Sequence, residues 1–147
     1  MKLSRALKKV SRLQGEINEL KGRLASCVSA LEENEFESDF KLLSKQISDK
    51  QKGLIDLRAQ IMATNVKHNM FRHILQLSQL KQDIDLLRKL NIKTGIELSM
   101  GYGESTKNKY KSQVQPSQRT EMVAKLQEEI ETLTDALDDF NATTDII

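Results

Sequence analysis

LSRALKKVSRLQGEINELKGRLASCVSAL, residues 3–31, is the stretch that decides the fold. Its apolar residues recur at alternating spacings of three and four, and they are Leu3, Ala6, Val10, Leu13, Ile17, Leu20, Leu24, Cys27 and Leu31. This spacing keeps one side of a helix facing a partner helix. The stretch therefore predicts a long helix over residues 2–31 with a single apolar seam.

Three later segments carry the same spacing. The second seam is Phe36, Phe40, Leu43, Ile47, Lys50, Leu54, Leu57, Ile61 and Thr64, and the third is Met70, His73, Leu77, Leu80, Ile84, Leu87, Asn91 and Thr94. The fourth is Val123, Leu126, Ile130, Leu133, Leu137 and Phe140. Where Lys50 interrupts the second seam, its long stem can lie along apolar surface while its charge stays in water. We expect helices over residues 36–64, 69–95 and 118–141.

Residues 99–117 differ from the rest of the chain, because they are polar and contain two glycines and the only proline. Within them, residues 109–114 alternate weakly, which makes a small β-hairpin a candidate for this loop. The sequence thus predicts an all-α fold, an elongated antiparallel bundle or coiled coil of four long helices. We expect one helical domain, residues 1–147, made of a hairpin over 1–64 and a second hairpin over 69–147.

Composition excludes several classes of protein. The chain has 147 residues, of which 4% are aromatic, and a net charge of +2, which is too balanced to indicate nucleic-acid binding by itself. A single cysteine, Cys27, cannot form an intrachain disulfide and suits a reducing compartment. No apolar run has the length of a secretion signal or a membrane helix. We therefore expect a cytoplasmic protein that does not enter a membrane.

Charge is distributed unevenly along the chain. Residues 1–24 carry a net charge of +5, and residues 119–145 carry −6. The two segments could match within a bundle or between subunits, or each could be a solvated face.

Carboxylates on the last helix raise the question of a metal site. Glu128, Glu129, Glu131, Asp135 and Asp138 lie about one turn apart, as in all-α nucleotide pyrophosphatases of the MazG type, which hold magnesium between two helices. The only second cluster of similar spacing is Glu16 and Glu19, among basic residues. A metal-dependent pyrophosphatase is therefore a minor alternative.

Other catalytic patterns are missing. His68 and His73 fit neither a di-iron bundle pattern nor a His-Glu-x-x-His zinc motif. Cys27 lies on the seam, which is typical of a small core residue. We expect no enzymatic activity, no catalytic residue, no bound metal and no cofactor.

Two basic segments make nucleic acid the second candidate ligand. Lys8, Lys9 and Arg12 crowd the first helix, and Lys109, Tyr110 and Lys111 lie in the loop at 102–111. Aromatic side chains among cations can stack on bases. The alternative interpretation of both segments is a solvated basic surface.

Four short segments carry a family resemblance. They are Lys2-Leu-Ser-Arg-Ala-Leu7, Ile61-x-x-Thr-Asn65, Leu80-Lys-x-x-Ile-x-x-Leu-Arg88 and Asn141-Ala-Thr-Thr-Asp-Ile146. Together they resemble a family of small bacterial helical proteins of uncharacterised function that are labelled septicolysin. The resemblance implies long helices, a small β element in the loop and self-association, and it brings no catalytic residue. The label suggests a pore-forming toxin, but the sequence has no long amphipathic β-hairpin or membrane-length apolar run.

The seams point to a function in binding. We expect a non-enzymatic helical scaffold that acts through self-association as a dimer or a higher even-numbered assembly, with another protein as a possible partner. The residues expected to form an oligomer seam or a helix seam are Val10, Leu13, Ile17, Leu20, Leu24, Ile130, Leu133 and Leu137.

Overall fold

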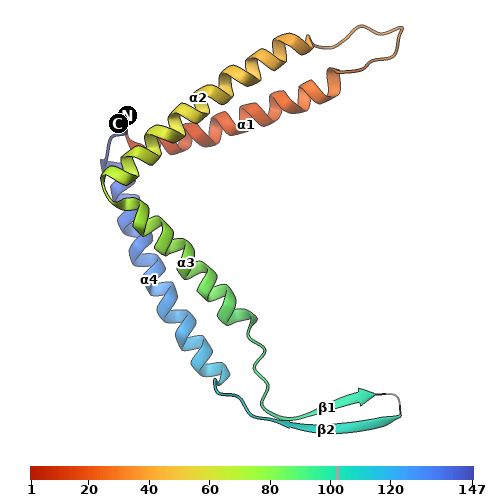
Figure 1. Cartoon of the computed structure of the whole chain (residues 1–147), viewed down its shortest axis with the longest axis vertical. Coiled ribbons are helices and arrows are strands. Elements are labelled where there is room, and N and C mark those ends of the chain that lie inside the picture. The colour runs from red at the N-terminus through yellow and green to blue at the C-terminus, as the bar shows by residue number, and fades with distance from the viewer. Residues whose placement is uncertain (102) are drawn as a thin grey trace. The chain divides into compact units, whose positions relative to one another are not determined.

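Four long helices and one small β-hairpin make up the fold. The computed structural model describes residues 1–101 and 103–147, and the side chains of residues 99, 100, 104 and 105 lie outside that description. The elements are α1 (Leu3–Cys27), α2 (Phe40–Lys67), α3 (Met70–Lys89), β1 (Gly95–Gly101), β2 (Glu104–Tyr110) and α4 (Pro116–Thr143) (Figure 1). The helices pack pairwise, α1 with α2 and α3 with α4. The predicted fold of four long helices with a small hairpin between the last two is confirmed.

The chain divides into two compact units. The first contains residues 1–71 and 136–147, and the second contains residues 72–135. Each unit is described by itself below, and the prediction of a single domain stays a prediction.

The seam of α1 packs against the seam of α2 in the first unit. One buried cluster contains Leu3, Ala6, Leu57 and Ile61, and Phe140 from the end of α4 packs against it. A second cluster contains Ile17, Ile47 and Leu54. Ile17 is only 1% exposed. The alternating spacing turns the α1 seam, which includes Ile17, toward α2. The predicted seam of the first helix is therefore the core of this unit.

The two ends of the chain meet beside the end of α2. A β-bridge joins Lys2 to Asp145, with a hydrogen bond of 2.8 Å from the Leu3 N–H to the Thr144 carbonyl. The Lys2 ammonium also donates to the Asp145 carboxylate at 2.9 Å. The first and last residues described are thus tied into the first unit by backbone as well as side-chain bonds.

Thr64 is the buried polar residue at this junction. It is 0% exposed, its hydroxyl donates to the Gln60 carbonyl at 2.8 Å, and it accepts from the Ile147 N–H at 3.1 Å. A buried hydroxyl that both donates and accepts carries little desolvation cost. Thr64, a polar residue in the apolar seam of α2, therefore holds the C-terminal segment through its hydrogen bond with Ile147.

In the second unit, α3 supplies the buried residues. Leu80 is 7% exposed and Ile84 is 6% exposed, whereas no residue of α4 is buried. The α4 seam residues Val123, Leu126, Ile130 and Leu133 are half-buried. A pair of helices covers only one side of each, so this unit has a thin core.

The first connection is longer than predicted. Residues 28–39 separate α1 from α2, whereas the sequence predicted helix to residue 31 and again from residue 36. The Asp39 carboxylate accepts the Leu42 N–H at 3.0 Å and so caps α2. An N-cap residue is not helical, so the helix cannot include Phe36.

Other helix ends also differ from the prediction, and α4 extends to Thr143, two residues past its predicted end. α2 continues to Lys67 and stops at Asn69, whose positive φ of 59° ends a helix without a glycine. α3 ends at Lys89 rather than at residue 95, because the chain becomes extended and Gly95 turns at a φ of +77° into β1. α4 begins at Pro116, two residues early, since proline suits the first helical position.

The hairpin also lies earlier than predicted. Its strands pair antiparallel with Gly95 opposite Tyr110 and Gly101 opposite Glu104, so it starts before the predicted loop at 99–117. The segment 109–114, predicted as a possible strand, contributes only its first two residues.

Replacing Ile17 by alanine tests the packing of α1 on α2. We expect Ile17→Ala to lower the free energy of unfolding by about 2–5 kcal/mol, because it empties a fully buried site. The control Asn18→Ala changes an exposed neighbour and should alter it by less than about 0.5 kcal/mol. Urea denaturation followed by circular dichroism, at one protein concentration, measures both. Equal effects of the two substitutions would contradict this packing.

Candidate interaction surfaces

The predicted seam residues of α1 face their own chain. Val10, Leu13, Leu20 and Leu24 pack against the buried cluster around Ile17. On α4, Ile130, Leu133 and Leu137 are half-buried. The α1 side chains therefore form a helix seam within the chain.

A second apolar row on α2 was missed in the sequence. Ile55 is 65% exposed, Met62 is 56% exposed and Val66 is 58% exposed. With Ala59 they are spaced by four, three and four residues, which is itself a heptad pattern and could have revealed them. We call Ile55, Ala59, Met62 and Val66 the α2 stripe. It lies next to the buried seam on α2, and no residue of its own unit covers it.

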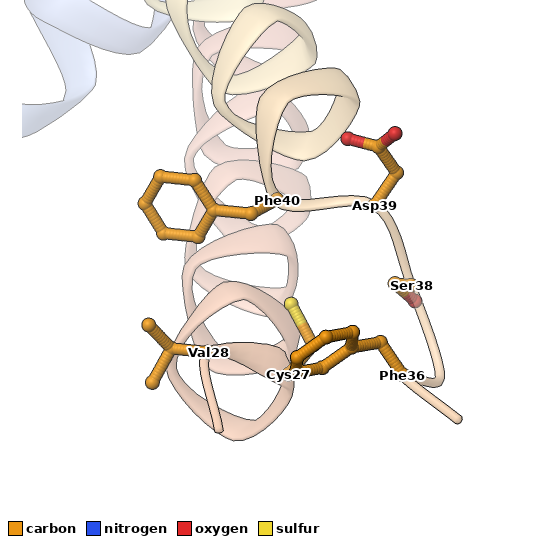
Figure 2. Close-up of a pocket in the computed structure, with 6 residues that line it drawn as sticks. All are labelled: Cys27, Val28, Phe36, Ser38, Asp39 and Phe40. Carbon is orange, nitrogen blue, oxygen red and sulfur yellow. The ribbon is translucent and has the colours of Figure 1, made fainter. Parts of the chain in front are cut away.

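The turn between α1 and α2 carries a second exposed apolar surface. Figure 2 shows Cys27 and Val28 coming from the end of α1, and Phe36 and Phe40 from the other side of the connection. With Ser38 and Asp39 they line a shallow hollow of about 390 Å³. We call residues 28–42 the tip. Its large apolar side chains that are 49–67% exposed are Val28, Leu31, Phe36, Phe40 and Leu42.

Acidic groups surround the apolar side chains of the tip. The tip, residues 28–42, contains five carboxylates and one lysine, Lys41, which gives it a net charge of −4. Glu35 and Glu37 line a second hollow of about 210 Å³ beside Phe36. None of the carboxylates in residues 28–40, all of which are described, forms an ion pair. The tip is therefore an apolar surface with a strongly negative border.

The β-hairpin has one face of opposite character. Ile96 pairs with Lys109 and Leu98 with Lys107, and residues directly opposite in an antiparallel pair share a face. Ile96 is 65% exposed and Leu98 is 64% exposed. We call Ile96, Leu98, Lys107 and Lys109 the hairpin face. It combines two apolar side chains with two lysines.

The other face of the hairpin holds Glu97 of β1. Glu97 points away from the hairpin face by strand alternation, and it lies 3.6 Å from the Lys93 ammonium. Lys93 also lies 4.9 Å from the centre of the Tyr110 ring. Lys107 and Lys109 are therefore the charged residues that share a face with Ile96 and Leu98.

The candidate nucleic-acid residues are exposed but fall in different units. Lys8, Lys9 and Arg12 line a shallow hollow of about 270 Å³ on α1, in the first unit. Lys109 and Lys111 are exposed in the second unit, where Tyr110 is half-buried under Lys93. Tyr102, part of the same predicted loop, lies outside the described residues.

The carboxylates considered for a metal site are dispersed or already paired. Glu16 pairs with Lys50 and Arg12, and Glu19 pairs with Arg23. Glu128 and Glu129 line a hollow of about 500 Å³ that also contains Lys125. Among the residues described, no three acidic, histidine or cysteine side chains are grouped so that they could hold a metal ion.

The two histidines differ in their surroundings. The His68 ring lies 5.4 Å from the Phe140 ring in the first unit. His73 is half-buried on the α3 seam, as predicted, and its Nδ1 is buried with no hydrogen-bond partner in the described structure.

Two ion pairs lower the pKa of their carboxyl groups. The hydrogen bond from Lys50, 2.6 Å from Glu16 Oε2, holds the pKa of Glu16 below its ordinary value. The hydrogen bond from Lys2 likewise lowers the pKa of Asp145. Lys50 thus fills its position in the α2 seam as predicted, with its stem half-buried and its charge on a carboxylate at the edge.

Comparisons with known proteins add no assignment. No family model, no curated protein and no solved structure matches the chain. The resemblance to the septicolysin-labelled family therefore stays a prediction. In the described residues, no helix combines the length and the apolar character needed to cross a bilayer.

Acidification should weaken the link between α1 and α2. Because the pKa of Glu16 is lower in the folded than in the unfolded chain, the pair stabilises the fold above the ordinary glutamate pKa of about 4.5, and this contribution is lost as the pH falls through the folded value. We expect Glu16→Gln to lower the urea midpoint at pH 7, and the difference from wild type should shrink as the pH falls below about 4.5. The control Glu19→Gln, whose pair with Arg23 lies within α1, should show a smaller difference at pH 7. A difference that persists unchanged at low pH would contradict this account.

Proposed function

We propose that this protein is a non-enzymatic helical scaffold that acts through self-association. The observation that carries the proposal is the α2 stripe, a heptad row of apolar side chains that the pairing of α1 with α2 leaves in water. Single exposed apolar residues are common on protein surfaces, but a continuous row of them marks an interaction site.

A second copy of the chain is the partner that suits the α2 stripe. The small side chain of Ala59 lies between the large side chains of Ile55 and Met62, so two copies of the helix can approach and interdigitate. Spacing of four, three and four residues is the pattern that helices use for pairing with one another. A two-fold axis through such a contact would give the predicted even-numbered assembly. We keep the expectation of a cytoplasmic location with this proposal.

Charge substitutions on the α2 stripe test the proposal. We expect wild-type protein to have a mass above the 16.8 kDa of one chain in light scattering at micromolar concentration. Ile55→Glu with Met62→Glu should lower that mass, because burying two carboxylates in an apolar contact is costly. The control Gln46→Glu with Gln60→Glu adds two carboxylates to exposed positions on another side of α2 and should leave the mass unchanged.

Circular dichroism establishes that each variant keeps its helices. A wild-type mass of one chain at all concentrations would overturn the proposed function. A wild-type assembly that survives the Ile55 and Met62 substitutions would remove the α2 stripe from it.

A further inference from the structure

We propose that the hairpin face of one chain docks on the tip of a second chain. This inference rests on the proposed function, since it names a contact within the self-association. It is carried by different residues from the α2 stripe, so the two can fail separately.

The side chains of the hairpin are exposed to water. Every residue of β1 and β2 whose side chain is described is exposed, except the half-buried Tyr110. A two-stranded ribbon without packing is marginally stable in water, and it becomes stable when an apolar face is covered. Ile96 and Leu98 form such a face, two residues apart on one strand. The hairpin is therefore built to be completed by contact with another surface.

The tip has an apolar surface that suits the apolar side chains of the hairpin face. Phe36 and Phe40 are 65% and 49% exposed on either side of the capping residue Asp39, and they line the hollow of about 390 Å³ (Figure 2). Aromatic side chains at the border of a shallow hollow are typical anchors of protein interfaces. Aliphatic side chains the size of Ile96 and Leu98 are suited to such a hollow.

The hairpin face and the tip carry opposite charges. Lys107 and Lys109 accompany the apolar side chains of the hairpin face, whereas Glu35 and Glu37 accompany Phe36 on the tip. Opposite charges around an apolar contact steer association and exclude wrong partners. Lys107 and Lys109, like Glu35 and Glu37, form no ion pair within the described part of the chain. The two surfaces therefore carry opposite net charges, +2 on the hairpin face and −4 on the tip.

A second copy of the chain is the occupant because each copy brings both surfaces. Two chains can then make the hairpin-on-tip contact twice, once in each direction, around a two-fold axis. The contact is chemically defined as an apolar centre with lysines on one side and glutamates on the other.

Charge reversal in two separate variants gives the decisive experiment. One variant carries Lys107→Glu and Lys109→Glu, and the other carries Glu35→Lys and Glu37→Lys. Each alone places like charges in the contact, and we expect the apparent dissociation constant at low salt to rise at least about tenfold. When the two variants are mixed, acidic hairpin meets basic tip and basic hairpin meets acidic tip, so the assembly should return.

The control for net charge is Lys8→Glu with Lys9→Glu. It makes the same change in charge as the hairpin variant, on an exposed part of α1 that belongs to neither surface, and it should leave the dissociation constant unchanged. For the wild type, raising the salt from about 0.05 M to about 0.5 M should weaken association, because screening acts on exposed charges. Circular dichroism of each variant verifies the helical fold.

The outcomes separate this contact from the proposed function. A dissociation constant that rises in each variant and returns to the wild-type value on mixing supports the contact. A dissociation constant that stays unchanged in both variants, or that is not restored on mixing, overturns the contact and leaves self-association through the α2 stripe in place. A wild-type protein of single-chain mass in all conditions overturns both.

Discussion

Packing of the α1 seam against the α2 seam is the interaction on which the first unit depends. Leu3, Ile17 and Leu54 are nearly or fully withdrawn from water there, and the chain ends are held beside the same helices through Thr64 and Lys2. A pair of helices has no third element to cover its other sides. The pairing of α1 with α2 therefore both stabilises this unit and leaves the apolar residues on the other sides of these helices exposed.

Exposed apolar residues are consequently ordered rather than scattered. Those on α2 include a heptad row, three of those of the tip line one hollow, and those of β1 share one face with two lysines. Apolar surfaces of this kind are suited to binding. They are the reason why self-association is the function we propose.

Helix ends show where local chemistry overrode the heptad pattern. Spacing alone extended the second helix back to Phe36, but Asp39 caps it three residues later in the chain. Spacing also carried the third helix to residue 95, where Gly95 instead turns the chain into a strand. Helix caps and positive φ angles depend on single residues, so the spacing of apolar residues over seven positions does not predict them.

The sequence by itself determined the four helices and their seams, because heptad spacing fixes which side of each helix avoids water. It left a small hairpin as a candidate for the loop between the last two helices. Only the tertiary structure decided which apolar residues stay exposed. Ile55 and Leu54 are neighbours of equal hydrophobicity in the chain, yet one is 65% exposed and the other 5%, because α1 covers one side of α2 and leaves the other. The pairing of Ile96 with Lys109 likewise depends on a strand register that composition does not specify.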